Sequence, residues 1–404
     1  MSSECDVKYV DRVIPRISLR DFDARVDEIT AELVAAAESY GIFVLTDHPV
    51  PQSAIDAQFA AGRRFFDLAD SVKDKTPFVT SANAGWEKNS QARPSTGCVD
   101  RNESYQMQFS DEHMAGRWVA DDDLPGFRNQ SLAFMHACHS LSTKLMMCLA
   151  RGLGLDDDQT FVNAHDITKP DIQTVLRALH YFARDAAAPT PARYCRAGPH
   201  ADWSFLTLLF QRPGQGGLEM CPGRDAVTDF GHGQGDDWTK IKPAEGEIVC
   251  NIGDLLMFWS DDRFKSALHR VRTPTDPAVD YYGDRYSLAF FNQPNSDCVV
   301  QGPKHKYPRV TGREFTQLAM KRNFAQLRRE QERQERQEQE QERGIQKERQ
   351  SAMIVPPVEF QAATSFSPYT GSMDAGDSAA ASAAFSMAAC MASASASAMT
   401  ASMM

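Results

Sequence analysis

Three side chains in the second half of the chain have the types and spacing of a metal site: His200, Asp202 and His269. If the segment around His200 is a strand, residues i and i+2 point to the same face about 6.6 Å apart, which places an imidazole beside a carboxylate. His269 lies in a second strand-like run, SALHRV. Two histidines and one carboxylate on one face of an octahedron leave three positions open. This ligand set is expected for non-haem Fe(II) that must bind a cosubstrate and O2.

The His-x-Asp pair is a weak signal by itself, because the chain has 10 histidines. A second pair of polar residues, also two positions apart, strengthens the prediction of a functional site. Arg285 and Ser287 would lie on one face of a strand downstream of His269. A guanidinium binds a carboxylate through two charge-assisted hydrogen bonds, and a serine hydroxyl can add a third. The two pairs together predict an anchored dicarboxylic acid whose other end reaches the metal.

The elements that must position these residues change in character along the chain. Apolar residues recur at helical spacing from Val26 to Tyr40, Gly41 ends that helix, and IFVLTDH follows as a strand. Two further helices are predicted over Ser53–Leu68 and Asn129–Arg151. After residue 172 the pattern becomes strand-like, in the runs TVLRALHYF, FLTLLFQ, EIVCNI, LLMFWS, LHRVRT and RYSLAFFNQ. Many short strands without long helices between them indicate a sandwich, jelly roll or barrel.

Composition and charge exclude several classes of protein. The 404 residues carry 43 Lys+Arg and 54 Asp+Glu, a net charge of −11, which argues against binding to nucleic acid or to an anionic membrane surface. The chain has no run of about 18 apolar residues, so no membrane span is predicted. The 9 cysteines are scattered without a Cys-x-x-Cys pair, which is typical of free thiols in a reducing compartment. We therefore expect a cytoplasmic protein.

Near residue 325 the composition changes sharply. Residues 326–350 are rich in Glu, Gln and Arg at spacings of three and four, which predicts a solvated helix but no coiled coil. Residues 351–404 are rich in Ala, Ser and Met, with few large side chains to offset the entropy of ordering, and are predicted to be disordered. The glycine-rich FGHGQGDD lacks the form of a phosphate-binding loop. Residues 1–325 are thus predicted to form the functional domain.

The motifs resemble those of the isopenicillin N synthase-like Fe(II)/2-oxoglutarate dioxygenases over nearly all of residues 10–310. The segments that carry the resemblance, in chain order, are VIPRISLRDF, AAAESYGIFVLTDHPVP, LPGFR, LARGLGL, PHADWSFLTLLFQRPGQGGLEM, WTKIKPAEGEIVCNIGDLLMFWSDDRFKSALHRV and DRYSLAFFNQPNSDCVV. The resemblance implies a mainly β fold with flanking helices: an N-terminal helical part over about 1–170 and a double-stranded β-helix (jelly roll) over about 171–310.

The resemblance also implies roles for single residues. It implies His200, Asp202 and His269 as iron ligands, and Arg285 and Ser287 as the grip on the distal carboxylate of 2-oxoglutarate. Tyr181 falls where many members have a tyrosine that contacts this cosubstrate, whereas the asparagine often found two positions earlier is Leu179 here. The loop TPTDPAVDYYG before Arg285 is longer than in many relatives. Substrate contacts, with core packing as the alternative, are predicted for Trp203, Phe205, Phe290 and Asn292.

The function that follows is oxidation of a small organic molecule of specialised metabolism by Fe(II), 2-oxoglutarate and O2, with ascorbate as a supporting reductant. The presence of Asp202 favours hydroxylation, desaturation or ring formation over halogenation. Two alternatives stay open: an iron oxidase or cyclase of the same family that does not consume 2-oxoglutarate, and a catalytically silent binding module. The enzyme is expected to act as a monomer.

Overall fold

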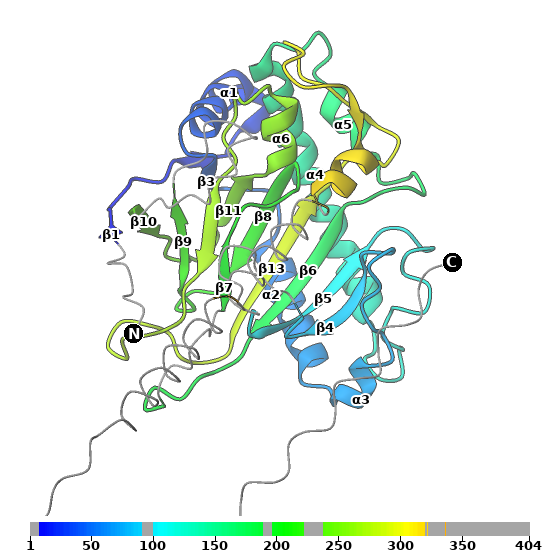
Figure 1. Cartoon of the computed structure of the whole chain (residues 1–404), viewed down its shortest axis with the longest axis vertical. Helices are drawn as coiled ribbons and strands as arrows, with labels where there is room; N and C mark the ends of the chain where they lie inside the picture. The colour runs from blue at the N-terminus through cyan, green and yellow to red at the C-terminus, as the bar shows by residue number, and fades with distance from the viewer. Residues whose placement is uncertain are drawn as a thin grey trace, which may run out of the picture. The chain divides into compact units, whose positions relative to one another are not determined.

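The β-strands of the protein form two packed sheets, described here from a computed structural model (Figure 1). The structure describes residues 8–90, 100–188, 196–221 and 237–319, together with Lys321 and Arg336, all within the first of two units into which the chain divides, Met1–Gly344. The predicted charged helix over 326–350, apart from Arg336, the predicted disordered tail and nearly all of FGHGQGDD lie outside these residues. The predicted domain boundary at residue 325 stays a prediction.

The larger sheet has eight strands in the order β2-β3-β11-β8-β13-β6-β5-β4. Neighbours pair antiparallel except β2 and β3, which run parallel. In chain order the strands are β2 (Arg16–Ser18), β3 (Ile42–Thr46), β4 (Gly85–Lys88), β5 (Asn102–Gln108), β6 (Val175–Tyr181), β8 (Leu206–Gln211), β11 (Ile248–Ile252) and β13 (Arg285–Asn292).

The smaller sheet has five strands in the order β1-β10-β9-β12-β7. They are β1 (Lys8–Tyr9), β7 (Ala197–His200), β9 (Leu218–Cys221), β10 (Asp237–Lys240) and β12 (Leu268–Val271), and a separate hairpin pairs β14 (Val299–Val300) with β15 (Val310–Thr311). Val44 and Val249 of the larger sheet share an apolar cluster with Leu218 and Met220 of the smaller one. The two sheets therefore enclose a core between them, which is the predicted double-stranded β-helix, or jelly roll.

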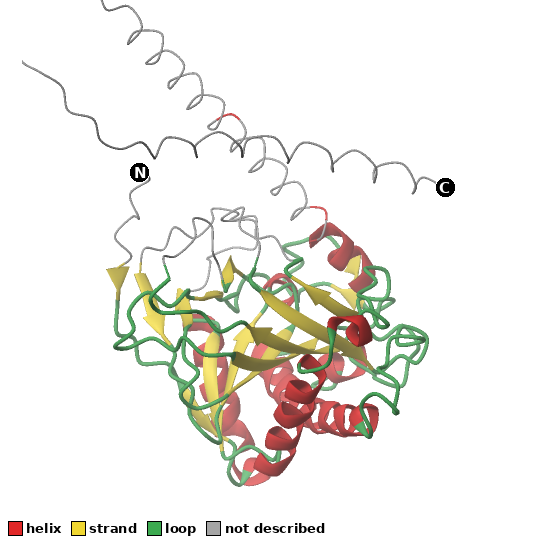
Figure 2. Cartoon of the chain, turned by 90° about the horizontal axis from the view of Figure 1, so that it is seen from below, coloured by secondary structure: helices red, strands yellow, loops and turns green. Residues whose placement is uncertain are grey.

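The helices cover the other face of the larger sheet (Figure 2). They are α1 (Phe22–Ser39), α2 (Gln52–Phe66), α3 (Asp70–Lys73), α4 (Phe127–Leu153), α5 (Thr160–Ala164) and α6 (Asp254–Trp259). Leu33 of α1 and Leu145 of α4 pack in one core with Phe43, Leu208 and Phe290 of the sheet. Alternate residues of each central strand thus face the helices or the smaller sheet, because side chains in a strand alternate between its two faces.

The first helix ends as the sequence predicts. Gly41 follows α1 with φ +70°, the left-handed conformation that favours glycine at a helix end. A Cβ atom there would lie 2.0 Å from the backbone oxygen of Lys265. Gly41 is therefore required both by the turn and by the close approach of a distant segment.

The prediction of a strand at LLMFWS is wrong. Residues 254–259 form the helix α6, and all of its apolar side chains are buried. A short apolar run does not distinguish a buried strand from a buried helix. The preceding Gly253 has no room for a side chain, because a Cβ there would lie 1.9 Å from the backbone oxygen of Ser204. The chain leaves the sheet at this contact and turns into α6.

Four strands in the first half were not anticipated: β1, β2, β4 and β5. Every residue of β5 is buried, although Glu103 is charged and four polar side chains, Asn102, Ser104, Gln106 and Gln108, share the opposite face. A strand with a buried polar face lacks the apolar alternation by which half-buried strands are recognised. Its partners in the tertiary structure make it a strand.

The described cysteines bear out the expected free thiols. Cys138, Cys148, Cys221 and Cys250 are buried and Cys298 is half-buried, with no disulfide among these five. Among the described residues, no helix is both long enough and apolar enough to span a membrane.

Candidate metal and cosubstrate site

The three predicted metal ligands come together where the two sheets meet. His200 is the last residue of β7, and its register partner in β12 is His269. Their ring centroids are 4.3 Å apart. The Asp202 Oδ1 atom lies 3.9 Å from Nε2 of His200 and 3.7 Å from Nε2 of His269. The register of two strands thus pairs the histidines, and the carboxylate faces both.

Asp202 reaches this position through a turn and not through the pleat of a strand. Because β7 ends at His200, the predicted same-face spacing of i and i+2 does not apply. The backbone oxygen of Asp202 accepts a hydrogen bond from the Asp254 N–H at 2.8 Å, and Gly253 lies against the same turn. The start of α6 therefore fixes the turn that carries the carboxylate.

Each ligand is oriented by a second contact. Nδ1 of His200 lies 2.8 Å from the Gly198 carbonyl oxygen, and Nδ1 of His269 lies 3.2 Å from that of Ala267. With the proton on each Nδ1, both Nε2 atoms present lone pairs toward Asp202. Such outer hydrogen bonds hold metal-binding imidazoles in one tautomer and one orientation.

The Asp202 carboxylate is held in the same way. Its Oδ2 accepts hydrogen bonds from Thr207 Oγ1 at 2.6 Å and Asn251 Nδ2 at 2.7 Å. The other oxygen, Oδ1, is the one that faces the two histidines. Thr207 and Asn251 are register partners on β8 and β11, so neighbouring strands supply both donors. Sequence reasoning missed these two residues, because only the pairing of the strands brings them to Asp202.

This donor set fits a divalent metal. Two ligand atoms at about 2.1 Å from one ion can be no more than about 4.2 Å apart, so the distances from Asp202 Oδ1 to both Nε2 atoms allow a shared ion. His200, Asp202 and His269 form the one cluster of three potential metal-binding side chains in the described part of the chain. Two imidazoles and one carboxylate match the facial ligand set of non-haem Fe(II).

Arg285, the first residue of β13 in the larger sheet, is almost completely buried, with 1% of its surface exposed. It begins β13 directly opposite Tyr181 of β6, and its guanidinium carbon lies 4.9 Å from the centroid of the tyrosine ring. Its Nη1 is 3.5 Å from the hydroxyl of Ser287. The structure therefore brings the three predicted cosubstrate residues together.

The guanidinium has no negative partner among the described residues. It donates to the backbone oxygen of Gln215 at 3.2 Å and to Oε1 of Gln211 at 2.9 Å, both of which are neutral. Burial, with the nearby charge of Arg196, lowers the pKa of Arg285, although Tyr181 opposes this effect. An arginine stays protonated even so. A buried cation without a counterion suits an anionic ligand.

The four predicted substrate residues occupy different places. Phe205 and Phe290 are completely buried in the core that the helices share with the larger sheet, and packing accounts for both. Asn292 is buried and donates to the backbone oxygen of Leu206 at 2.9 Å. Trp203, next to Asp202, is half-buried. The alternation of β13 instead places Phe291, which was not predicted, on the same face as Ser287.

His180 belongs to a hydrogen-bonded network on the helix-covered face of the larger sheet. Its Nδ1 lies 2.9 Å from Glu103 and its Nε2 lies 3.0 Å from Asp284. Glu103 also accepts hydrogen bonds from Lys73 at 2.8 Å and Trp86 at 2.9 Å. Burial raises the pKa of Glu103, but these hydrogen bonds outweigh it and the net pKa is lowered. These hydrogen bonds join β4, β5 and β6 on the face of the larger sheet that the helices cover.

The long loop between β12 and β13 is pinned at both ends. Arg196 donates to the backbone oxygens of Tyr281 and Gly283 at 3.0 and 3.1 Å, and Asp280 accepts hydrogen bonds from the backbone N–H groups of Thr275 and Asp276. Arg196 is 1% exposed. The loop therefore delivers the chain to Arg285 in a defined conformation.

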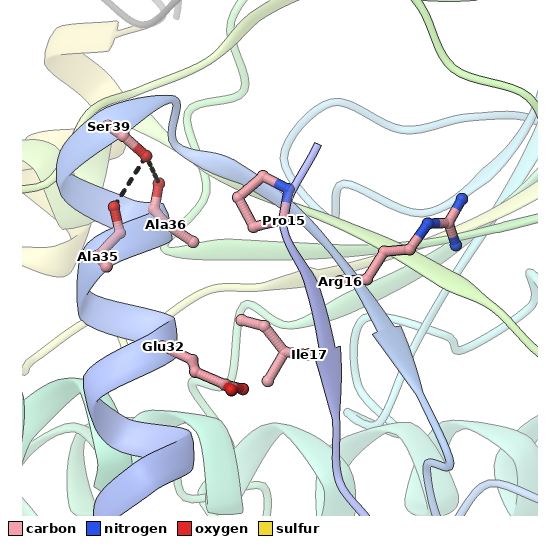
Figure 3. A pocket seen from close by; sticks show the side chains of 7 residues that line it. All are labelled: Pro15, Arg16, Ile17, Glu32, Ala35, Ala36 and Ser39. Carbon is pink, nitrogen blue, oxygen red and sulfur yellow. Dashed lines mark hydrogen bonds between the residues drawn. The ribbon is translucent and has the colours of Figure 1, made fainter. Parts of the chain in front are cut away.

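A separate hollow between α1 and the segment around β2 carries no comparable chemistry (Figure 3). Glu32 is the single carboxylate among its lining residues, and the Ser39 hydroxyl is engaged with the backbone oxygens of its own helix. The lining consists of Pro15, Arg16, Ile17, Glu32, Ala35, Ala36 and Ser39.

Two family models match this chain. The model of the 2OG-Fe(II) oxygenase superfamily matches residues 174–294, and that of the non-haem dioxygenase in morphine synthesis N-terminal family matches residues 14–123. The 2-oxoglutarate-dependent dioxygenase frbA of Dothideomycetidae sp. (strain 11243) is 29% identical over 345 residues, which cover 77% of this chain and 97% of that protein.

Two further similarities agree with these matches. The proline hydroxylase buaE of Petromyces alliaceus is 32% identical over 303 residues, which cover 71% of this chain and 89% of that protein. The crystal structure of a full-length Neurospora crassa protein in complex with alpha-KG has a TM-score of 0.63 and 27% identity, covering 75% of this chain and 94% of that one. The similarity spans both the helical part and the jelly roll.

Proposed function

This chain belongs to the 2OG-Fe(II) oxygenase superfamily and is an Fe(II)- and 2-oxoglutarate-dependent dioxygenase; we propose that it oxidises a small molecule of specialised metabolism with its metal at His200, Asp202 and His269. The observation that carries this assignment is the convergence of two Nε2 atoms and one carboxylate oxygen, each oriented by a second contact. Fe(II) held there would supply the activation of O2, coupled to decarboxylation of 2-oxoglutarate to succinate and CO2.

The protein's own residues have distinct tasks in this proposal. Arg285 and Ser287 bind the distal carboxylate of 2-oxoglutarate, and the ring of Tyr181 packs against the guanidinium. The buried position of Arg285 supports this role, because a guanidinium in a low-dielectric site binds a carboxylate more strongly than it does in water. Thr207 and Asn251 keep the Asp202 carboxylate turned toward the metal.

The class of substrate follows from the relatives and the charge of the chain. A relative is named a proline hydroxylase, and the Neurospora crassa protein is also known in complex with thymine. Thymine is a small molecule. The net charge of −11 provides no general attraction for nucleic acid. We therefore propose a small organic substrate, with Trp203 and Phe291 as its first candidate contacts.

Oxygen consumption tests the proposal directly. The purified protein with Fe(II), a metabolite panel and ascorbate should consume O2 only when 2-oxoglutarate is present, with succinate formed in step. Consumption that does not depend on 2-oxoglutarate would favour the oxidase or cyclase alternative. Intact succinate formation by a His200→Ala variant would contradict the metal assignment, whereas an absence of iron binding by the wild type would favour a silent binding module.

Two further expectations belong with this proposal. We infer that the enzyme acts as a monomer and that it works in the cytoplasm. Light scattering of the full chain and imaging of a tagged protein in its source cells measure these two properties. A stable oligomer or a different compartment would contradict them without affecting the assigned chemistry.

A further inference from the structure

Gln211 lies beside the two residues proposed to bind the distal carboxylate. It is the last residue of β8, and its register partner in β13 is Ser287. Because paired residues of neighbouring strands point to the same face, its side chain lies on the side of Ser287 and Arg285. Its Oε1 accepts a hydrogen bond from Arg285 Nη2 at 2.9 Å, and only 8% of the residue is exposed.

The other end of this side chain is unsatisfied. Nε2 of Gln211 is buried and has no hydrogen-bond partner among the described residues. Exchange of the amide oxygen and nitrogen would not help, because it would place an NH2 group against the donors of Arg285. The carbonyl must therefore face the guanidinium, and the NH2 group must point elsewhere. A buried donor of this kind is rare in folded proteins and calls for an acceptor.

The neighbours of Ser287 show which strand can supply a further donor. On β6 its register partner is Leu179, which has no polar side-chain atom. On β8 its partner is Gln211. The Ser287 hydroxyl, the guanidinium of Arg285 and the amide of Gln211 thus lie together on this face of the sheet. All three can donate to one carboxylate.

We propose that Gln211 binds the distal carboxylate of 2-oxoglutarate through its side-chain NH2 group while its carbonyl oxygen orients Arg285. This inference rests on the proposed function, because it assumes that the distal carboxylate lies at Arg285. Gln211 then has two tasks in one side chain. Its carbonyl oxygen accepts a hydrogen bond from Arg285 without neutralising the positive charge. Its NH2 group donates a hydrogen bond to the carboxylate that this charge attracts.

Two substitutions separate these tasks from simple packing. Gln211→Met keeps the approximate length of the side chain but removes the donor and the acceptor. Gln211→Glu keeps the shape and places a carboxylate against Arg285, where it would compete with the ligand. Equilibrium binding of 2-oxoglutarate is measured anaerobically by calorimetry on the Fe(II)-loaded full chain. Parallel titrations use 2-oxopentanoate, which has the same carbon chain but no distal carboxylate.

We expect Gln211→Met to weaken 2-oxoglutarate binding about tenfold, as expected for one hydrogen bond to a charged group, and to leave 2-oxopentanoate unchanged. Gln211→Glu should weaken 2-oxoglutarate binding by roughly a hundredfold or more, because the introduced carboxylate pairs with the buried guanidinium. Gln58→Met is the matched control. Gln58 is a buried glutamine in α2 that donates to Ser131, and its loss should lower thermal stability without affecting either titration.

A double-mutant cycle distinguishes direct binding from positioning through Arg285. In an Arg285→Gln background, direct binding predicts that Gln211→Met still weakens 2-oxoglutarate relative to 2-oxopentanoate. Absence of any further loss in that background would overturn the direct contact. Unchanged 2-oxoglutarate binding by Gln211→Met in the otherwise wild-type chain would overturn the whole inference. By contrast, a wild-type protein that binds both acids equally would refute the proposed cosubstrate site itself, whatever the variants do.

Discussion

Arg285→Gln is predicted to abolish tight cosubstrate binding while leaving the free protein nearly as stable as the wild type. The side chain is 1% exposed, and its contacts among the described residues are all with neutral groups. Its charge is therefore desolvated and has hydrogen bonds to neutral groups, but no opposite charge from the described part of the chain, until an anion binds. Removal of one partner of a buried ion pair costs about 3–5 kcal/mol, which corresponds to a roughly 10²- to 5 × 10³-fold weaker binding of 2-oxoglutarate.

The stability of the cosubstrate-free protein should change in a different way. Removal of the charge relieves its desolvation but leaves the acceptors of Gln211 and Gln215 unpaired, and these two effects oppose one another. We expect a net change in the free energy of unfolding of less than about 1 kcal/mol. The wild type at 100 times its Kd for 2-oxoglutarate should gain about 2.7 kcal/mol, whereas the variant should gain almost nothing at the same concentration.

Anaerobic urea denaturation of the Fe(II)-loaded protein, with and without 2-oxoglutarate, measures both quantities in one series. Arg263→Gln is the control, because Arg263 is a half-exposed arginine that pairs with Glu38 at 2.7 Å and lies outside the site. It should show the full ligand-induced stabilisation. The reasoning is refuted if Arg285→Gln retains that stabilisation, or if it loses several kcal/mol in the absence of ligand, which would make Arg285 a structural residue.

Three other predictions concern the surroundings of the site. Asn251→Ala should weaken Fe(II) binding about tenfold, because it removes one of the two donors that hold Asp202; unchanged iron affinity in a competition assay would contradict this. Gly253→Ala should reduce both the iron content and the thermal stability, since its Cβ would lie 1.9 Å from a backbone oxygen, whereas Gly62→Ala meets only an ordinary 3.8 Å contact and should be tolerated. Glu103→Gln should destabilise the protein at neutral pH. Because the folded-state pKa of Glu103 is lowered, the wild-type advantage is present above about pH 4.3 and is lost as the pH falls further. Chemical denaturation from pH 3 to 7, about the range of that titration, tests this, and a difference independent of pH would refute it.

The helices and the central strands were predictable from local patterns. The helical spacing of apolar residues from Val26 to Tyr40, and the glycine after it, correspond to α1, and the apolar runs after residue 172 correspond to β6, β8, β11, β12 and β13. The helix α6 and the strand β5 were not predictable in this way. The short, fully buried apolar run of α6 fits a buried strand equally well, and the buried polar face of β5 lacks the usual apolar pattern of a strand.

The sequence by itself determined which side chains could form the site: two histidines, one aspartate, and an arginine and a serine with period two. Few residue types can bind a metal or a carboxylate in this way. The alternation of side chains along a strand already places Arg285 and Ser287 on one face. Only the tertiary structure decided what surrounds them. The pairing of β7 with β12 places the histidines together, that of β8 with β11 supplies the donors to Asp202, and that of β8 with β13 sets Gln211 beside Arg285. The contacts of Asp202 with Asn251 and of Gln211 with Arg285 join residues 49 and 74 positions apart, and their register depends on the whole sheet and not on any local pattern.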